Sequence, residues 1–136
     1  MQVKDVMTSP CITCTQDQPL QRAAQMMAKL DYGSIPIDDG DRLVGMLTDR
    51  DIVTRGLAQS PDLSRLKAGD LMSDKILYCR EDDDCATVAR NMGEMQVRRL
   101  PVVDADKRLK GMVSLGDLTR ANAPQMTGEA LDEIVD

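Results

Sequence analysis

The sequence predicts a mixed α/β (α+β) fold made of two copies of one β-α-β-β-α unit. Three observations support this prediction: an internal repeat, a helical period in each copy, and two short apolar runs around an Asp-rich turn in each copy. The segment VKDVM at Val3 recurs as AGDLM from Ala68, 65 positions later. After one inserted residue, placed at Arg108, the spacing becomes 66, as between Asp51 and Asp117. A match of this length indicates a duplicated domain rather than a solenoid of short repeats.

The chain length limits the number of domains that the protein can contain. Its 136 residues accommodate two copies, each of about 60 residues. A unit of that size buries only about 60% of its unfolded surface and is marginal alone, so the copies should pack together and the protein should form a homodimer. The predicted boundaries are residues 1–58 for the first copy, 59–67 for a linker, 68–122 for the second copy and 123–136 for an acidic tail.

Each copy is expected to open with a short polar turn that ends in Met, followed by a strand at residues 11–14 or 76–79. A helix comes next, because apolar residues recur at i, i+3, i+4, i+7 and i+10. These residues are Leu20, Ala23, Ala24, Met27 and Leu30 in the first copy, and Cys85, Val88, Ala89, Met92 and Met95 in the second. Pro19 fits the first helical position of the first helix. Asp83 and Asp84 suit the start of the second through capping and the helix dipole.

Two short strands joined by a tight turn should follow in each copy. SIPI and RLVGML flank an Asp/Gly-rich turn in the first copy, and RLPVV and RLKGMV flank an Asp-rich turn in the second. Because proline cannot donate to a strand ladder, Pro36 and Pro101 should lie on a sheet edge or at the start of a strand. A second helix should begin at Thr48 and at Ser114 and run to about residues 57 and 121.

The amino-acid composition argues against several classes of function. The formal net charge is −6, and the sequence has no basic helix or aromatic-and-basic stripe, so nucleic-acid binding is not expected. No apolar run approaches about 18 residues and the N-terminus has no apolar signal-peptide core, so we expect a cytoplasmic protein without a membrane span. Ten Met residues stand where aromatic residues are nearly absent, which suits either an adjustable core or an ordinary aliphatic one.

Four cysteines raise the question of a metal site or a redox motif. Cys11 and Cys14 form a C-x-x-C, but residues three apart on a strand face opposite sides. The stretch also lacks the helix start that a thioredoxin motif needs. The chain contains no His, which leaves a zinc site short of ligands. We therefore expect no metal, and buried structural thiols at Cys14 and its repeat partner Cys79.

A Thr/Ser-x-x-Asp pattern after each hairpin carries the candidate site. Thr48 with Asp51, and Ser114 with Asp117, are typical of capping boxes, in which the hydroxyl and the acid satisfy two backbone N–H groups at a helix start. A helix N-terminus also attracts anions, and a carboxylate in its first turn can accept two hydrogen bonds from a vicinal diol such as ribose. The residues allow capping alone, or capping combined with nucleotide binding.

The β-α-β-β-α repeat, the hydrophobic-Pro-hydrophobic steps (SIPI, RLPVV) and the endings GMLTDRDI and GMVSLGDL together resemble a tandem pair of cystathionine β-synthase (CBS) domains. The resemblance covers about residues 3–122. It implies two repeats packed sheet to sheet with pseudo-twofold symmetry, and two clefts between them that bind adenosine-containing ligands such as AMP, ADP or ATP. It also implies a disc-like homodimer and a regulatory module without catalysis.

The resemblance assigns roles to particular residues. Asp51 and Asp117 would bind ribose hydroxyls, while Thr48 and Ser114 would bind ribose or phosphate. The adenine slots would be lined by apolar segments near Ile12, Ile35, Pro36, Ile76, Leu100 and Pro101. Because no aromatic residue is placed to stack on adenine, backbone edges and aliphatic packing would recognise the base. The basic residues placed for phosphate are Arg50, Arg98 and Arg99.

The resemblance further implies two unequal clefts. The Arg98-Arg99 pair would complete the cleft of Asp51, although this pair could also be no more than a solvated surface pair. Guanidinium groups bind phosphate bidentately, so this cleft would prefer ligands with more phosphate. The cleft of Asp117 would face the Gly33-Ser34 segment, with Arg50 as its cation, and would take less charged adenosine compounds or stand empty.

Two other functions compete with ligand sensing. An enzyme with Asp51 and Asp117 as acid and base needs the two carboxylates to converge, whereas pseudo-symmetric copies put them in separate clefts. The sequence also has no His base, nucleophile motif, G-x-G-x-x-G or Walker loop. The other alternative is a structural or protein-interaction module with no ligand. The presence of both acids and both hydroxyls argues against it, because a cap alone would also accept Asn or Glu. A ligand-dependent readout would need the oligomer or a protein partner in trans.

Overall fold

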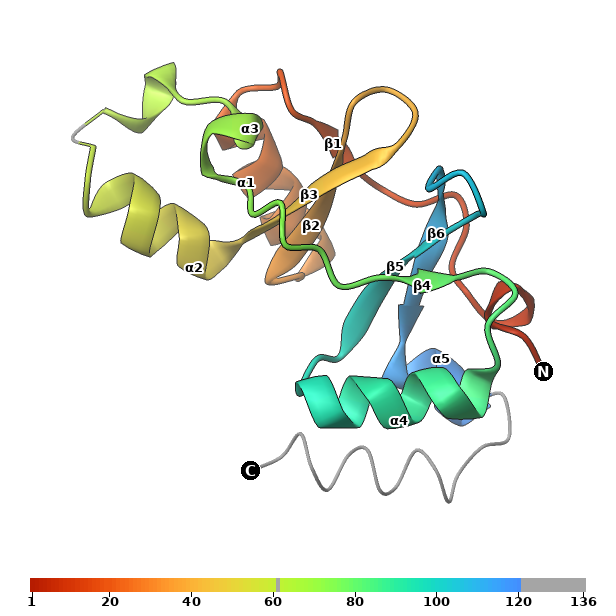
Figure 1. Cartoon of the computed structure of the whole chain (residues 1–136). Helices are drawn as coiled ribbons and strands as arrows, with labels where there is room; N and C mark the ends of the chain where they lie inside the picture. The colour runs from red at the N-terminus through yellow and green to blue at the C-terminus, as the bar shows by residue number, and fades with distance from the viewer. Residues whose placement is uncertain (61, 121–136) are drawn as a thin grey trace. The chain divides into compact units, whose positions relative to one another are not determined.

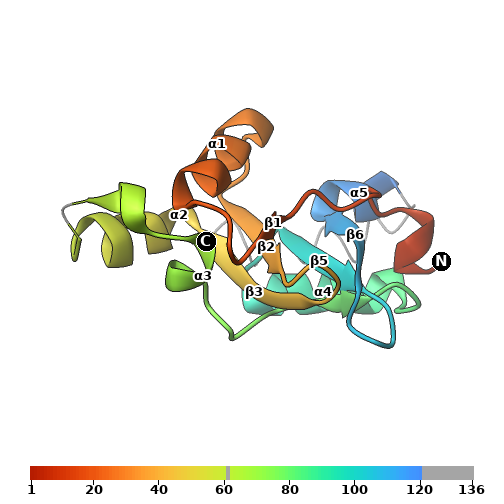
Figure 2. The same ribbon diagram turned by 90° about the horizontal axis from the view of Figure 1, so that it is seen from above.

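The computed structural model describes residues 1–60 and 62–120, which form two compact units (Figures 1 and 2). Unit 1 combines Met1–Cys11 with the chain from Leu77 onward, and unit 2 is Ile12–Ile76. Each unit contains one three-stranded sheet with helices, which confirms the predicted α/β (α+β) class. The predicted tail at residues 123–136 lies outside the described residues.

Unit 2 has the predicted β-α-β-β-α order. Its elements are β1 (Cys14–Thr15), α1 (Leu20–Leu30), β2 (Ser34–Asp38), β3 (Leu43–Thr48), α2 (Asp49–Asp51) with its π-helical continuation η2 (Ile52–Leu57), η3 (Leu63–Arg65) and α3 (Ala68–Leu71). The sheet order is β1-β2-β3, with β1 and β2 parallel and β2 and β3 antiparallel.

Unit 1 repeats this order. Its elements are η1 (Val3–Asp5), β4 (Cys79–Arg80), α4 (Cys85–Met95), β5 (Arg99–Val103), β6 (Leu109–Ser114) and α5 (Leu115–Arg120). The sheet order is β4-β5-β6, again with one parallel and one antiparallel pairing. The second helix of each copy thus starts directly after Thr48 or Ser114, as the sequence predicts.

The helices α1 and α4 bury most of the predicted apolar face. The fully buried members are Leu20, Ala23 and Met27 on α1, and Cys85, Val88, Ala89 and Met92 on α4. Asp84 caps α4 as predicted, because its Oδ2 accepts a hydrogen bond from the backbone N–H of Thr87 at 3.2 Å. The prediction that Pro19 is the first helical residue is wrong by one position. Pro19 is the N-cap of α1, with an extended ψ of 142°, and the helix begins at Leu20.

Pro36 and Pro101 lie inside the middle strands, and the prediction of an edge or a strand start is wrong. Pro36 is opposite Met46, whose backbone N–H and C=O both pair with Ser73 on the far side of β3, at N···O distances of 2.9 and 2.8 Å. The β2–β3 ladder therefore needs no N–H from Pro36. Pro101 has the same relation to Met112.

The same prolines explain why β1 and β4 begin later than predicted. The sequence predicts strands at residues 11–14 and 76–79, but parallel pairing starts at Cys14 and Cys79. Their partners, Ile37 and Val102, directly follow the two prolines. Since proline has no N–H to offer the neighbouring strand, the ladder stops there. Ile12 and Ile76 consequently lie in irregular chain before each strand.

The first hairpin turn is held by a side chain. Asp39 Oδ1 accepts hydrogen bonds from the backbone N–H groups of Arg42 and Asp41, at 2.8 and 3.0 Å. These bonds stabilise the ionised form and hold the pKa of Asp39 below its ordinary value, the one from Arg42 having the largest effect. Gly40 supplies the positive φ of 102° that the turn requires. The predicted Asp/Gly turn is confirmed.

The opening segment of each sequence copy packs into the unit of the other copy. Val3 is fully buried in the core of unit 1 with α4 and β5, and Ala68 and Leu71 are buried in the core of unit 2. In both views of Figures 1 and 2 the red N-terminal segment lies with β6 and α5, while the green α3 lies with β3. The compact units therefore do not follow the boundaries between the sequence copies.

Three of the four thiols are buried. Cys14, Cys79 and Cys85 lie in the two cores, as expected for structural cysteines, whereas Cys11 is half-buried. Burial raises the pKa of the Cys79 thiol to about 12 and raises the pKa values of Cys14 and Cys85 as well. These three groups stay protonated at neutral pH, which suits a packing role.

Candidate functional site

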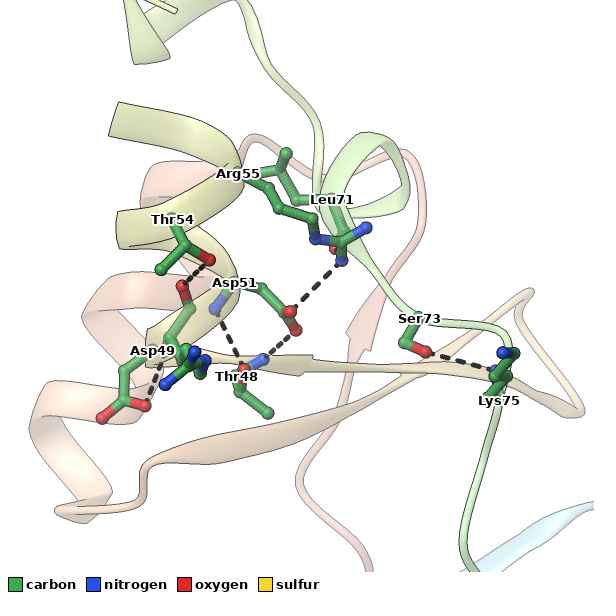
Figure 3. A network of polar contacts seen from close by, with 9 residues as sticks. Thr48, Asp49, Asp51, Thr54, Arg55, Leu71, Ser73 and Lys75 are labelled. Atoms are coloured by element: carbon green, nitrogen blue, oxygen red, sulfur yellow. Dashed lines mark hydrogen bonds and ion pairs between the residues drawn. The ribbon is translucent and has the colours of Figure 1, made fainter. Parts of the chain in front are cut away.

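The strand-to-helix turn is built the same way in both units. In unit 2, Thr48 Oγ1 accepts a hydrogen bond from the Asp51 N–H at 3.0 Å, and Asp51 Oδ2 accepts one from the Thr48 N–H at 2.9 Å (Figure 3). In unit 1, Ser114 and Asp117 form the same reciprocal pair at 3.1 and 2.9 Å. The predicted capping boxes are confirmed, and each fixes a hydroxyl and a carboxylate at a helix start.

The chain just before the middle strand lies beside each turn. The backbone N–H of Asp49 donates to the Gly33 carbonyl at 2.9 Å, and Ser34 is opposite Thr48 in the β2–β3 ladder. Each turn is therefore enclosed by the start of a hairpin as well as by its end. In unit 2 the enclosing residues are small and uncharged.

In unit 1 the corresponding position is basic. The backbone N–H of Leu115 donates to the Arg98 carbonyl at 3.1 Å, and Arg99 is opposite Ser114 in the β5–β6 ladder. Both arginines are exposed. The structure thus brings Arg98 and Arg99 to the turn of Asp117 within one unit. Their predicted role at Asp51 joins residues of different units and stays a prediction.

The residues predicted to line the adenine slots have different environments. Ile35 and Leu100 belong to the cores of units 2 and 1, so a ligand could meet them only through their backbone. Pro36 and Pro101 are buried as well. Ile12 is 48% exposed. Ile76 is half-buried, and Arg50, which is predicted to contact phosphate, is exposed.

Sequence reasoning missed Arg55. Its Nη2 lies 3.3 Å from Asp51 Oδ1, and it also donates a hydrogen bond to the backbone carbonyl of Leu71, the last residue of α3 (Figure 3). An acid and a base four residues apart on a helix are a known pairing signal, so the ion pair could have been found. The contact with Leu71 could not, because it depends on where α3 packs.

Unit 2 also contains an apolar cavity of about 320 Å³. Its lining residues are Leu20, Gln21, Ala24, Ile52, Leu63 and Ser64. Its lining includes Ile52, which directly follows Asp51, but neither Thr48 nor Asp51 itself.

Within residues 1–60 and 62–120, no group of three or more Cys, Asp or Glu side chains is arranged to hold a metal ion, and the whole sequence lacks His. In the same part of the chain, no helix has the length and hydropathy needed to cross a membrane.

Two copies of one unit, each with a hydroxyl and an acid fixed at the same strand-to-helix turn, define a tandem-repeat module. The family model of the CBS domain matches residues 3–57 and 68–123, and the chain belongs to that family as a tandem pair. Hypoxic response protein 1 of Mycobacterium tuberculosis is 41% identical over 118 residues, which cover 86% of this chain and 82% of that protein.

Solved structures give the same result. The structure of Hypoxic Response Protein I with two coordinated zinc ions has a TM-score of 0.77 and 39% identity, and covers 88% of this chain and 98% of that one. CBSX2 in complex with AMP has a TM-score of 0.75 and 29% identity, covering 92% and 97%. The CBS domain pair of protein MJ0100, in complex with 5′-methylthioadenosine and S-adenosyl-L-methionine, has a TM-score of 0.72 and 28% identity, covering 92% and 98%.

Proposed function

We propose that this protein is a regulatory module that binds an adenosine-containing ligand through its two strand-to-helix turns and has no catalytic activity of its own. The observation that carries the proposal is the repeated capping box, with Asp51 and Asp117 held in the same way in both units. Binding of AMP by one structural relative, and of two adenosine compounds by another, supports the ligand class.

The capping hydrogen bonds use only some of the hydrogen-bonding positions of these side chains. An ionised carboxylate has two oxygens and about four lone-pair positions, and the cap of Asp51 uses one position on Oδ2. Further positions can accept hydrogen bonds from the two hydroxyls of a ribose. The hydroxyls of Thr48 and Ser114 accept through the cap and can still donate to a phosphate or ribose oxygen.

The alternative, a structural or protein-interaction module without a ligand, is favoured by no separate observation. It predicts that the aspartates matter only for stability. A cap needs just one acceptor oxygen, so asparagine would serve as well. Ribose binding needs the charge and both oxygens of the carboxylate.

We also propose that the protein forms a homodimer. Val53 and Leu57 are 56% and 62% exposed on η2, and their spacing of four residues puts them on one face of the helix. Apolar side chains grouped in this way suit a contact with a second copy. The ligand state would then be read through the dimer or by a protein partner in trans.

The proposal is tested by native mass spectrometry and thermal-shift measurements on the purified full chain. Adenosine, AMP, ATP, S-adenosylmethionine and 5′-methylthioadenosine form the panel, with GMP as the control. At least one adenosine compound should remain bound in the native spectrum and raise the melting temperature, while GMP should do neither. If none of the five binds at millimolar concentration, the proposed function is wrong.

A further inference from the structure

We infer that Arg55 is a positioning residue for ribose recognition: it orients the carboxylate of Asp51 and makes the Asp51 site selective for ribose over deoxyribose. The inference rests on the proposed function and deepens it. It assigns a role to a residue that lies outside the capping box and carries no predicted contact with the ligand.

Arg55 is attached at two points. Its Nη2 is 3.3 Å from Asp51 Oδ1, and the same guanidinium donates to the carbonyl of Leu71 (Figure 3). A planar guanidinium held by two acceptors loses much of its freedom to rotate. Its position is therefore set by the backbone of α3 as well as by Asp51, unlike an ordinary surface ion pair.

The attachment at Leu71 is firm because η2 and α3 are in close contact. A Cβ added at the buried Gly56 would lie 2.9 Å from Cδ1 of Leu71, so the absence of a side chain there lets the helix approach α3. Leu71 itself belongs to the core of unit 2. The anchor of Arg55 is thus part of the folded core.

The carboxylate of Asp51 is consequently held at both oxygens. The Thr48 N–H fixes Oδ2, and Arg55 fixes Oδ1. The plane of the carboxylate is then set before a ligand arrives, with the remaining lone pairs of each oxygen in fixed directions. A vicinal diol needs two acceptors at a fixed spacing, whereas a deoxyribose uses one, so a fixed carboxylate favours the diol.

The second copy differs at the position of Arg55 in the sequence. Asp117 has its Ser114 cap, but the position four residues further on is Ala121, whose side chain carries no charge. The two acids are therefore alike in their caps, and the residue four positions further on is Arg55 in one copy and Ala121 in the other. This difference gives the experiment an internal reference: removal of Arg55 should alter the Asp51 site and leave the Asp117 site as it was.

The test compares adenosine with 2′-deoxyadenosine by isothermal titration calorimetry. In an Asp117→Ala chain, which keeps the Asp51 site, adenosine should bind about tenfold more tightly than 2′-deoxyadenosine. Adding Arg55→Ala should reduce this ratio to about one, mainly by weakening adenosine. Arg55→Lys should recover part of it, since lysine keeps the charge but not the planar fork.

Arg65→Ala is the matched control. Arg65 forms an exposed i, i+3 ion pair with Asp62 at 3.7 Å, so its removal takes away the same charge from the same unit without touching Asp51. It should leave the ribose preference at about tenfold. The melting temperature of every variant is measured, and the titrations are repeated for Arg55→Ala with Asp117 intact, where two sites are fitted.

Two results would overturn the inference while the proposed function stands. One is an unchanged preference for adenosine after Arg55→Ala. The other is an equal loss of affinity for both nucleosides, which would give Arg55 a purely structural role. Failure of the unsubstituted chain to bind any ribonucleoside would instead overturn the proposed function, and the inference with it.

Discussion

Ser73 and Met46 pair through two backbone hydrogen bonds, in which the N–H of each residue donates to the carbonyl of the other. Ser73 lies in the second sequence copy and Met46 in the first. The N···O distances are 2.9 and 2.8 Å. Thr8 and Met112 repeat the exchange at 2.8 and 3.0 Å with the copies reversed. Each copy therefore supplies the segment that completes the sheet and core of the other copy's unit.

This exchange predicts where core substitutions act. Val3→Ala should cost about 2 kcal/mol of stability, because Val3 is fully buried in unit 1. Hydrogen exchange in the full chain should show lower protection in α4, β5 and β6, with α1, β2 and β3 little changed. Leu71→Ala should give the mirror result in unit 2. Loss of protection in unit 2 after Val3→Ala would contradict the exchange of segments.

The same contacts predict that replacing either of two glycines lowers the stability of the protein. A Cβ at Gly45 would lie 2.6 Å from Sδ of Met72, and a Cβ at Gly111 would lie 2.5 Å from the carbonyl oxygen of Thr8. Gly45→Ala should therefore destabilise the protein by about 1–3 kcal/mol, and Gly111→Ala should cost more, because a paired backbone carbonyl moves less readily than a methionine. Thermal and urea unfolding measure both.

A second substitution separates the two cases. Met72→Ala removes the nearest atom at Gly45 and should restore part of the stability lost in Gly45→Ala. Met7→Ala should not rescue Gly111→Ala, because the clash with Thr8 remains. Equal rescue at both positions would show that side-chain crowding alone decides the cost.

Stability should fall at alkaline pH through the buried thiols. Burial raises the pKa of Cys79 from its ordinary 9.0 to about 12, so the folded state disfavours the thiolate. The stability of the folded state is unaffected by this thiol below pH 9. As the pH rises from 9 to 12, the unfolded state loses the Cys79 proton first, so the free energy of unfolding falls with a limiting slope of about 1.4 kcal/mol per pH unit. Urea unfolding between pH 8 and 11 should show a shallower decline for Cys79→Ala.

The proposed homodimer depends on the exposed face of η2. Leu57→Asp places a charge at a residue that is 62% exposed, so it should leave the fold intact and convert the dimer to a monomer. Sedimentation velocity at micromolar concentration measures the change. Gln59→Asp adds the same charge at an exposed position just beyond the helix and should remain dimeric. A monomeric unsubstituted protein would contradict the proposal.

The sequence predicted the features that depend on neighbouring residues. The period of α1 and α4, the Asp-rich turns and the capping boxes all rest on contacts within a few positions, such as the Thr48–Asp51 pair. The family resemblance rests on the same local motifs and is confirmed. Arg55 belonged in this group too, because its partner Asp51 is four residues away.

Features that depend on long-range pairing were missed. Pro36 looked like an edge residue because the sequence does not show that Ser73 occupies the other side of Met46. The exchange of opening segments was hidden for the same reason: a repeat shows which residues correspond, but not which copy each of them packs against. The link from Arg55 to the carbonyl of Leu71 also depends on this packing.

The central claim is that Asp51 and Asp117 bind ribose as well as cap a helix. Calorimetry with the tightest adenosine ligand on the unsubstituted chain, Asp51→Asn, Asp117→Asn and the double variant tests it most directly. Asparagine keeps an acceptor oxygen for the cap, so each variant should stay folded, and its melting temperature is measured beside its affinity. Each single variant should lose about 10- to 100-fold in affinity at one site, and the double variant at both. Unchanged affinity in the folded double variant would contradict the account and leave the two aspartates as caps alone.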